Sequence, residues 1–297
     1  MNLIKRFFLF ILINLLVVIT ISTLLSIFKV GPYLNAYGLD INKLAIFCLL
    51  WGFAGALISL FLSKSIAKWL MRVQIIDGRD VNSKFILDIV EKISIEAGLE
   101  NPPEVGLYES NEVNAFATGP TKKRSLLALS TGLINRLPQD EIEAIIGHEI
   151  SHITNGDMIT MTLLQGVVNA FVMFLARILA FSIFSSNRKS RSSYSSGHYF
   201  FVYIFEIVFM ILGSIVLASF SRKREFRADE SSANLVGKDK MIKALSSLKA
   251  LQPIKDKKKQ VASINALKIS NPSKRGLLNL FSTHPPIDDR IERLKNL

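Results

Sequence analysis

Residues 137–157 read LPQDEIEAIIGHEISHITNGD and contain the pattern HExxH between His148 and His152. On an α-helix each residue advances about 100°, so side chains four positions apart share one face. His148 and His152 would then project together and could hold one metal ion through their ring nitrogens, with the Glu149 carboxylate beside them. The arrangement is typical of hydrolytic zinc sites, although HExxH also arises by chance in roughly one chain of this length in a hundred.

The residues around this pattern favour a helix that carries a functional site. Pro138, Asp140 and Glu141 suit a first helical turn, and the residue types at 155–157 tolerate the left-handed turn that ends a helix. Glu149 falls within the edge of the apolar face, where a carboxylate is costly unless it is paired or used. That face is formed by isoleucines at helical spacing, namely Ile142, Ile145, Ile146, Ile150 and Ile153. We therefore favour a metal site over a purely structural helix.

The composition places the chain in a membrane. It is 49% hydrophobic and carries a formal net charge of +12. A hydrocarbon core needs about 20 apolar residues, and four stretches are long enough: 7–28, 44–63, 159–184 and 199–220. The first is too long for a signal peptide and lacks a cleavage site, so we expect a retained anchor that forms a hairpin with the second. The sole cysteine, Cys48, rules out a disulfide framework within the chain.

Basic residues beside these stretches predict the orientation. Three groups agree that both termini and residues 64–158 are cytoplasmic: Lys5 and Arg6; Lys64, Lys68 and Arg72; and Arg222, Lys223 and Arg224. A fourth group disagrees, because Arg188, Lys189 and Arg191 lie in the Ser-rich loop that should be external. Either the bias is overruled there, or the third and fourth stretches form a hairpin that does not fully cross. Arg177 and Glu206, within those two stretches, are expected to pair with each other, and the alternative is that they line a polar cavity.

The polar residues form two blocks, 64–158 and 221–297, separated by the second hydrophobic hairpin at 159–220. Each block is small for a core of its own, so we expect the two to fold together. The expected elements are a helix at 84–97, strands at 103–108 and 125–130 with a turn region between them, and helices at 225–235, 240–251 and 287–294. A charged loop is expected at 255–260. The predicted fold class is a mainly α membrane protein, with a transmembrane hairpin at 1–63 and an α+β domain built from two separated segments.

A third protein ligand is needed if the site holds zinc. Glu225 and Asp229 lie four residues apart, just after the last hydrophobic stretch, and share a helix face. Such a pair can supply one ligand and one acceptor that orients a ligating imidazole. The ordinary alternative is that both acids only balance the cations around them, Arg222, Arg224 and Arg227.

Taken together, these motifs resemble the HtpX family of heat-shock proteases, which are membrane-bound zinc metalloendopeptidases related to the eukaryotic CAAX prenyl endopeptidases. The resemblance covers nearly the whole chain. It rests on HEISH followed by NGD at 155–157, PEVG at 103–106, NAFATG at 114–119, the Glu225 and Asp229 pair, and HPP at 284–286 with Arg290. The departures are Gly147, where a better helix former is more usual, and the Ser-rich loop.

The resemblance implies a zincin-like metalloprotease domain with one zinc ion per chain. It makes His148, His152 and Glu225 the ligands, Glu149 the catalytic base, and Asp229 the acid that orients a ligand. Glu149 would accept a proton from the attacking water and deliver it to the leaving amine.

The resemblance also implies residues that contact the substrate. His284 and Arg290 would steady the substrate carbonyl or the oxyanion. Asn114, Ala115 and Phe116 would offer a strand edge to an extended polypeptide.

The expected partners are misfolded membrane proteins and unfolded polypeptides, cleaved at the cytoplasmic face of a bacterial inner membrane. Anionic lipid at the inner leaflet explains the positive charge better than nucleic acid, because no basic motif with interleaved aromatics is present. The sequence predicts no oligomeric state. Three alternatives stand beside this interpretation: an intramembrane protease of the site-2 class, a prenyl-protein endopeptidase proper, and a membrane scaffold without activity.

Overall fold

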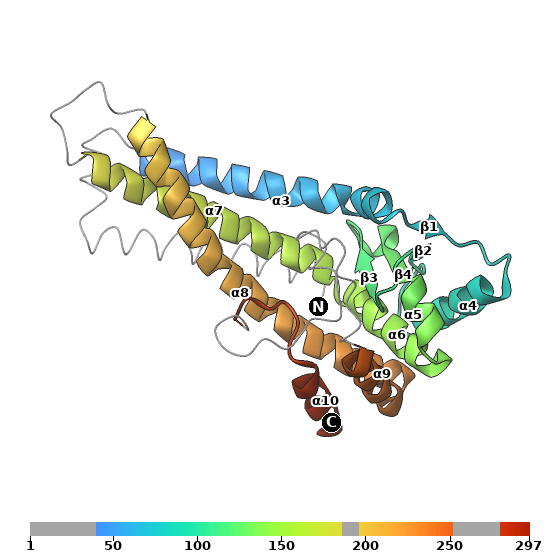
Figure 1. Ribbon diagram of the computed structural model, residues 1–297. Helices are drawn as coiled ribbons and strands as arrows, with labels where there is room; N and C mark the ends of the chain where they lie inside the picture. Colours follow the sequence, from blue (N-terminus) through green and yellow to red (C-terminus); the bar gives the residue numbers. More distant parts are fainter. Residues whose placement is uncertain (1–39, 186–195, 252–279) are drawn as a thin grey trace. The chain divides into compact units, whose positions relative to one another are not determined.

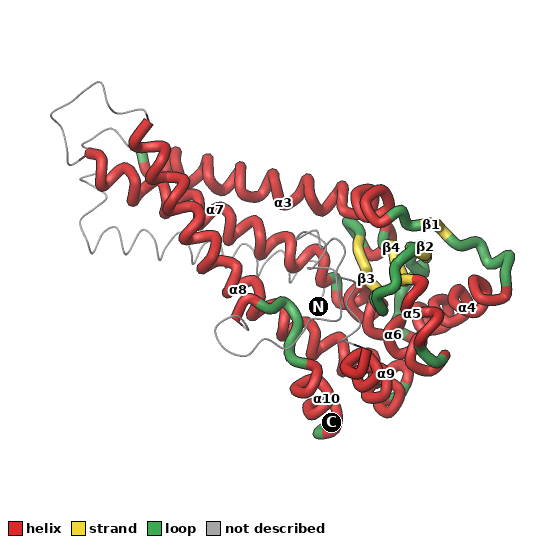
Figure 2. Tube along the Cα trace, in the orientation of Figure 1, coloured by secondary structure: helices red, strands yellow, loops and turns green. Residues whose placement is uncertain are grey.

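The computed structural model describes residues 40–185, 196–251 and 280–297 of the 297-residue chain. Helices dominate, and the strands are confined to one small sheet (Figures 1 and 2). In chain order the elements are α3 (Ile41–Met71), β1 (Gln74–Ile75), α4 (Val81–Glu96), β2 (Glu104–Tyr108), β3 (Ala115–Thr118), the 3-10 turn η1 (Lys122–Arg124), β4 (Leu126–Ser130), α5 (Thr131–Arg136), α6 (Gln139–Asn155), α7 (Asp157–Ser185), α8 (Ser196–Val236), α9 (Lys238–Leu251) and α10 (Ile287–Lys295). The mainly α class is confirmed, and the strands form one small mixed sheet.

Three helices among the described residues are long and apolar enough to cross a membrane. They are Ile41–Met71, Asp157–Ile183 and His198–Val236, and they cover three of the four predicted spans to within one residue. The span predicted at 7–28, the basic group at 188–191 and the loop predicted at 255–260 lie outside the described residues. The helix expected at 225–235 is not separate from the last span, since both belong to the single helix α8.

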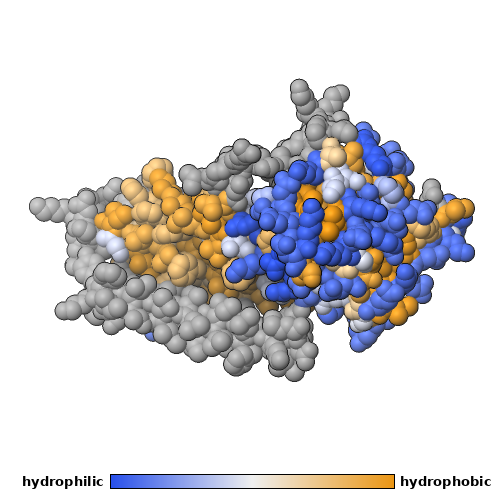
Figure 3. Space-filling view, turned by 90° about the horizontal axis from the view of Figure 1, so that it is seen from below, coloured by the Kyte–Doolittle hydropathy of each residue, from blue (hydrophilic) through white to orange (hydrophobic). Residues whose placement is uncertain are grey.

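The internal contacts of the chain divide it into two units, and residues 40–59, 160–185 and 196–217 belong to the first. In this unit α3 packs on α7 around Cys48, which is buried against Phe174 and Ile178. The predicted ion pair is confirmed, because Arg177 donates to Glu206 over 2.7 Å. In the space-filling view, apolar side chains cover the visible surface of this unit. Hydrophilic residues cover most of the visible surface of the second unit (Figure 3).

The second unit contains the four-stranded sheet, in the order β1-β2-β4-β3. β2 and β4 are parallel, and the other two pairings are antiparallel. β3 is an edge strand of this sheet and lies in the segment expected to be a turn region. Its four residues are too few to show an alternating pattern, yet they pair with β4 from Ala115 opposite Leu129 to Thr118 opposite Leu126.

One apolar core in the second unit contains side chains from both polar blocks of the sequence. Ile86 of α4, Leu127 of β4 and Ile145 of α6 are buried in it, together with Leu248 of α9 and Leu294 of α10. Helix α6 contacts α4, β3 and α9, so its residues are surrounded by packed elements. The fold therefore places the HExxH helix at the centre of this unit.

Candidate metal centre

The HExxH pattern lies in the second half of α6, and this helix ends as its sequence predicts. Gly156 adopts a left-handed conformation, with φ 63° and ψ 40°, and its N–H bonds back to the carbonyls of His152 and Ile153. A residue with a β-carbon rarely adopts this conformation, so glycine suits the position. The predicted apolar face is buried, and so are both histidines and Glu149.

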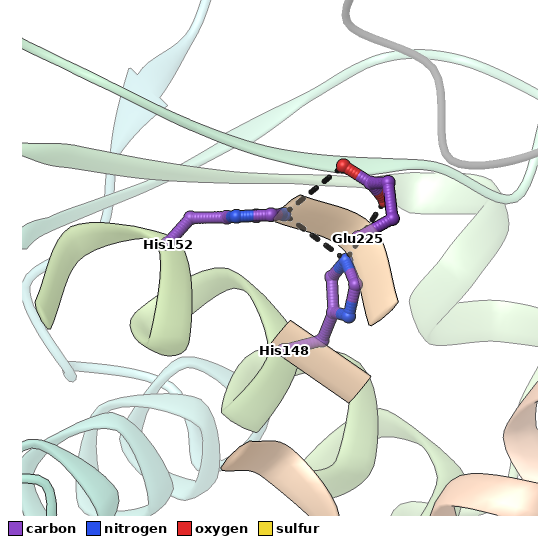
Figure 4. A group of neighbouring side chains, drawn as sticks. All are labelled: His148, His152 and Glu225. Carbon is purple, nitrogen blue, oxygen red and sulfur yellow. Dashed lines mark hydrogen bonds and ion pairs between the residues drawn. The ribbon is translucent and has the colours of Figure 1, made fainter. Parts of the chain in front are cut away.

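His148, His152 and Glu225 converge, although Glu225 comes from α8 (Figure 4). The two Nε2 atoms are 3.2 Å apart. The Glu225 oxygens Oε2 and Oε1 lie 3.4 Å from the Nε2 atoms of His148 and His152, respectively. Zinc binds nitrogen at about 2.0–2.1 Å, so ligand atoms at the corners of a tetrahedron around it lie about 3.3 Å apart. The three side chains therefore fit a small divalent metal ion.

Each histidine has a carboxylate at its other ring nitrogen. The Nδ1 atom of His152 hydrogen-bonds to Asp157 Oδ2 at 2.7 Å, and Nδ1 of His148 lies 2.9 Å from Asp229 Oδ1. A carboxylate at Nδ1 favours the tautomer whose Nε2 lone pair is available to a metal. Sequence reasoning assigned no such contact to Asp157, which it read only as part of the helix end. The signal was its place directly after the left-handed Gly156, which returns the chain toward the preceding histidine.

Glu225 has no exposed surface and contacts more than the two histidines. His284 Nδ1 lies 2.8 Å from Glu225 Oε2, and Arg224 donates to Glu225 Oε1 over 3.1 Å. His284 Nε2 is buried and has no hydrogen-bond partner among the described residues. This nitrogen is therefore available to a group that enters the site.

Arg290 lies behind the metal site and is fully buried. Its Nε and NH2 groups donate to the two oxygens of Asp229, over 2.7 and 2.6 Å. The sequence interpretation placed Arg290 on the substrate, whereas the structure places two of its donor groups on Asp229. A chain of contacts therefore runs from Arg290 through Asp229 to the imidazole of His148.

The electrostatics of the site favour positive charge. Burial disfavours the protonated form of His148, but the carboxylates of Asp229 and Glu225 outweigh it and raise its pKa to about 9. Burial also opposes protonation of His152, and Glu225 is the main group that raises its pKa above the usual value. Carboxylates that stabilise a protonated imidazole also stabilise a bound cation.

The segment at 114–116 is buried beside this centre. Asn114 donates through Nδ2 to the Tyr108 hydroxyl over 2.7 Å, and its N–H donates to Ser130 Oγ over 3.0 Å. The Phe116 ring packs on Tyr108 with 5.7 Å between centroids, and Ala115 is in the main core. These side chains have structural contacts, so only the backbone of the β3 edge is left to meet an extended substrate.

Gly147, the departure noted in the sequence, lies where α6 and α8 come close together. A β-carbon at this position would lie 2.8 Å from Ser232 Oγ. Ser232 in turn donates to the carbonyl of Ala144 over 2.8 Å. The glycine therefore gives room for the contact that holds the C-terminal part of α8 against the HExxH helix.

The C-terminal segment, from residue 280 onward, also binds α8. Arg222 of α8 donates to the carbonyls of Leu280 and Ser282 over 3.1 and 2.9 Å. Further along, the Arg293 guanidinium lies 5.0 Å from the centre of the Phe226 ring. Together with the contacts of His284 and Arg290, these interactions tie the C-terminal segment to α8 on both sides of Glu225.

The sequence is similar to those of known proteases. The model of peptidase family M48 matches residues 82–297. A protease HtpX homolog of Bacillus licheniformis is 46% identical over 98% of this chain and 99% of its own length, and one of Bacillus subtilis is also 46% identical over the same shares. Protease HtpX of Hahella chejuensis is 44% identical over 97% of this chain and 98% of its own length.

Among solved structures, the crystal structure of Ste24p from S. mikatae shares the fold. It superposes with a TM-score of 0.58 at 16% identity, over 98% of this chain and 67% of that one. The chain is a membrane metalloprotease that belongs to peptidase family M48, within its HtpX group.

Proposed function

We propose that the protein is a zinc-dependent endopeptidase that cleaves the cytoplasmic parts of misfolded membrane proteins, and unfolded polypeptides, at a bacterial inner membrane. The observation that carries the proposal is the triangle of ligand atoms from His148, His152 and Glu225, with edges of 3.2, 3.4 and 3.4 Å. Two imidazoles and one carboxylate are a common ligand set of hydrolytic zinc sites, which keep a fourth position for water.

The residues around the triangle supply the rest of the chemistry. When bound, zinc polarises the scissile carbonyl and makes water a stronger nucleophile at neutral pH. Glu149 follows His148 directly in the sequence, and its side chain is buried. It accepts the proton of the attacking water and passes it to the leaving amine. The Nε2–H group of His284 would donate a hydrogen bond to the oxygen that gains charge in the transition state.

The expected substrates follow from two features of the chain. The edge strand β3 contacts α6, so an extended polypeptide that adds to this edge would run along the HExxH helix. The apolar helix α7 begins at Asp157, directly after α6 and its cap, and α8 carries both an apolar span and Glu225. Such connections favour substrates that are themselves held in the membrane.

The structure counts against an intramembrane protease of the site-2 class. Such an enzyme has HExxH inside a spanning helix, whereas α6 is not among the candidate spans of the described residues. The alternative of a membrane scaffold without activity predicts a protein that binds no metal or cleaves no substrate. The experiment below distinguishes it from a protease.

The test uses the full-length protein, purified in detergent. We expect about one zinc per chain by mass spectrometry of the metal, and cleavage of unfolded casein at internal bonds. Removal of the metal by a chelator should stop cleavage, and zinc should restore it. Undiminished cleavage by the metal-free protein would overturn the proposal.

The substrate class needs a second experiment. The protein is reconstituted in liposomes with a membrane protein whose cytoplasmic domain is either folded or destabilised by mutation. Selective cleavage of the destabilised form supports the proposed role, and equal cleavage of both forms contradicts it.

A further inference from the structure

The last three turns of α3 have an unusual distribution of side chains. Residues 60–71 belong to the second unit, and here the lysines face the protein. Lys64 and Lys68 both contact the Glu104 carboxylate, with their Nζ atoms 2.5 and 2.7 Å from its oxygens. Ala67, between them, is buried against the side of the sheet that carries Tyr108. The polar side of this helix end is therefore turned inward.

The opposite side of the same turns is apolar and exposed. Trp69 is 81% exposed and Phe61 is 65% exposed. At about 100° per residue, the exposed apolar side chains cover one half of the helix circumference, with Ser65 as the polar residue among them, and the other half carries Ala67 and the two lysines. The exposed apolar side chains are Phe61, Leu62, Ile66, Trp69 and Leu70. A continuous apolar surface of this kind marks a contact with lipid or with another protein.

We propose that this side of α3 lies in the membrane, with acyl chains against Phe61 to Leu70 and Trp69 at the boundary with the lipid headgroups. The helix itself argues for lipid, because Ile41–Met71 is a candidate span and the exposed side continues it without a break. Exposed apolar side chains run from Ile46 to Leu70, roughly 25 residues or about 37 Å of helix. A tilt of about 35°, within the range found for membrane helices, fits this length to a hydrocarbon core of about 30 Å.

The sequence alone ended this span at residue 63, because Lys64 and Lys68 resemble the first residues outside a membrane. Their contacts with Glu104 remove that reason, since the paired charges face the sheet and not the lipid. Arg72, which is exposed and has a φ of 51°, then becomes the first cation beyond the membrane boundary. Tryptophan is the residue type expected at that boundary.

The two tryptophans of the chain allow a direct test, because both lie on α3. Trp51→Phe leaves Trp69 as the only indole in the protein. The full-length variant is reconstituted in liposomes of phosphatidylcholine and phosphatidylglycerol. Fluorescence quenching is measured with lipids brominated at different positions along the acyl chain, and with acrylamide in the water.

We expect brominated lipid to quench Trp69 several-fold more than the acrylamide does, most strongly when bromine lies near the headgroup end of the chain. Trp69→Phe, which leaves Trp51 inside the span, serves as the control for lipid contact and should be quenched by bromine deeper in the chain. Glu292→Trp with both native tryptophans replaced is the control for water, because Glu292 is exposed on α10.

Two results would overturn the proposal. Quenching of Trp69 by acrylamide alone would show that this side faces water. Quenching by neither agent would show that protein covers Trp69. The measurement would then be repeated at a higher ratio of lipid to protein. If a second copy covers Trp69, quenching by lipid should appear on dilution, whereas residues of the same chain would keep Trp69 covered.

Discussion

Arg290 holds Asp229 with two parallel hydrogen bonds of 2.7 and 2.6 Å, although the two residues are 61 positions apart in the sequence. Both side chains are buried, so neither charge is compensated by water. Burial opposes the charged form of Arg290, but Asp229 more than offsets this and raises the pKa of the guanidinium. Asp229 also lies against Nδ1 of His148, so the position of this proposed metal ligand depends on the pair.

Replacement of Arg290 should therefore affect metal binding without removing a ligand. Arg290→Met leaves Asp229 buried without its partner and should weaken zinc binding by about 10–100-fold, as loss of a group behind a ligand does. Arg290→Lys keeps the charge but loses the paired hydrogen bonds, so an intermediate effect is expected. Zinc affinity is measured by competition with a chromogenic chelator, and the absorption spectrum of the cobalt-substituted protein reports the geometry of the site.

Two comparisons sharpen this prediction. Lys295→Met removes an exposed cation from the same helix and should leave zinc affinity unchanged. Because Arg290 acts through Asp229, its effect should largely disappear in an Asp229→Asn background. Full additivity of the two substitutions would contradict the contact chain.

Glu149→Gln should abolish cleavage and leave zinc bound. The amide cannot accept a proton from the attacking water, and such proton transfer typically contributes about 10²–10⁴-fold to the rate. Metal content and casein cleavage are measured on the same preparation. Glu96→Gln, the same change at an exposed position on α4, should behave as wild type. Substantial turnover by Glu149→Gln would remove Glu149 from the mechanism.

Glu225→Ala should lose zinc and activity together, because it removes one of three ligands. Asp229→Asn should instead weaken zinc by roughly 10–100-fold, since it alters only the group behind His148. Glu230→Ala, the next acid on α8, is the control and should retain both zinc and activity. Full occupancy in Glu225→Ala with an empty site in Asp229→Asn would reverse the two assignments.

The predicted orientation can be tested with reporter fusions. A reporter near residue 100 or after residue 297 should behave as cytoplasmic, on the balance of the basic residues beside the spans. Lys64 and Lys68 are paired with Glu104, so they no longer count as free positive charges beside the span. The predicted orientation then depends on Arg72 and on Arg222, Lys223 and Arg224. An external reporter at either place would reject both the orientation and the proposed substrates.

Local sequence patterns predicted the elements whose signals are local. Helix α6 and its left-handed end at Gly156 follow from periodic isoleucines and one glycine, and α9 and α10 were placed to within two residues. Local patterns read the segment of strand β3 as a turn region, because four residues carry no periodic signal and the pairing with β4 is a tertiary contact. Only the family resemblance implied a strand edge there.

The parts of the site that depend on long-range contacts were harder to predict. The sequence could show that Asp229 and Arg290 are charged, but not that they meet across 61 residues. In the same way, Tyr108 gave no signal that it would bond to Asn114 and so leave only the backbone of that segment for a substrate.

The proposed addition of a substrate to β3, at the edge of its sheet, has a consequence for selectivity. An edge strand binds through backbone N–H and C=O groups, which every sequence possesses. In a folded protein these groups are already paired within helices and sheets, whereas a damaged or unfinished chain presents them in extended form. Recognition at such an edge therefore reports the conformation of a polypeptide and is largely indifferent to its sequence. A protease built in this way can act on many unrelated proteins and still spare each of them while it is folded.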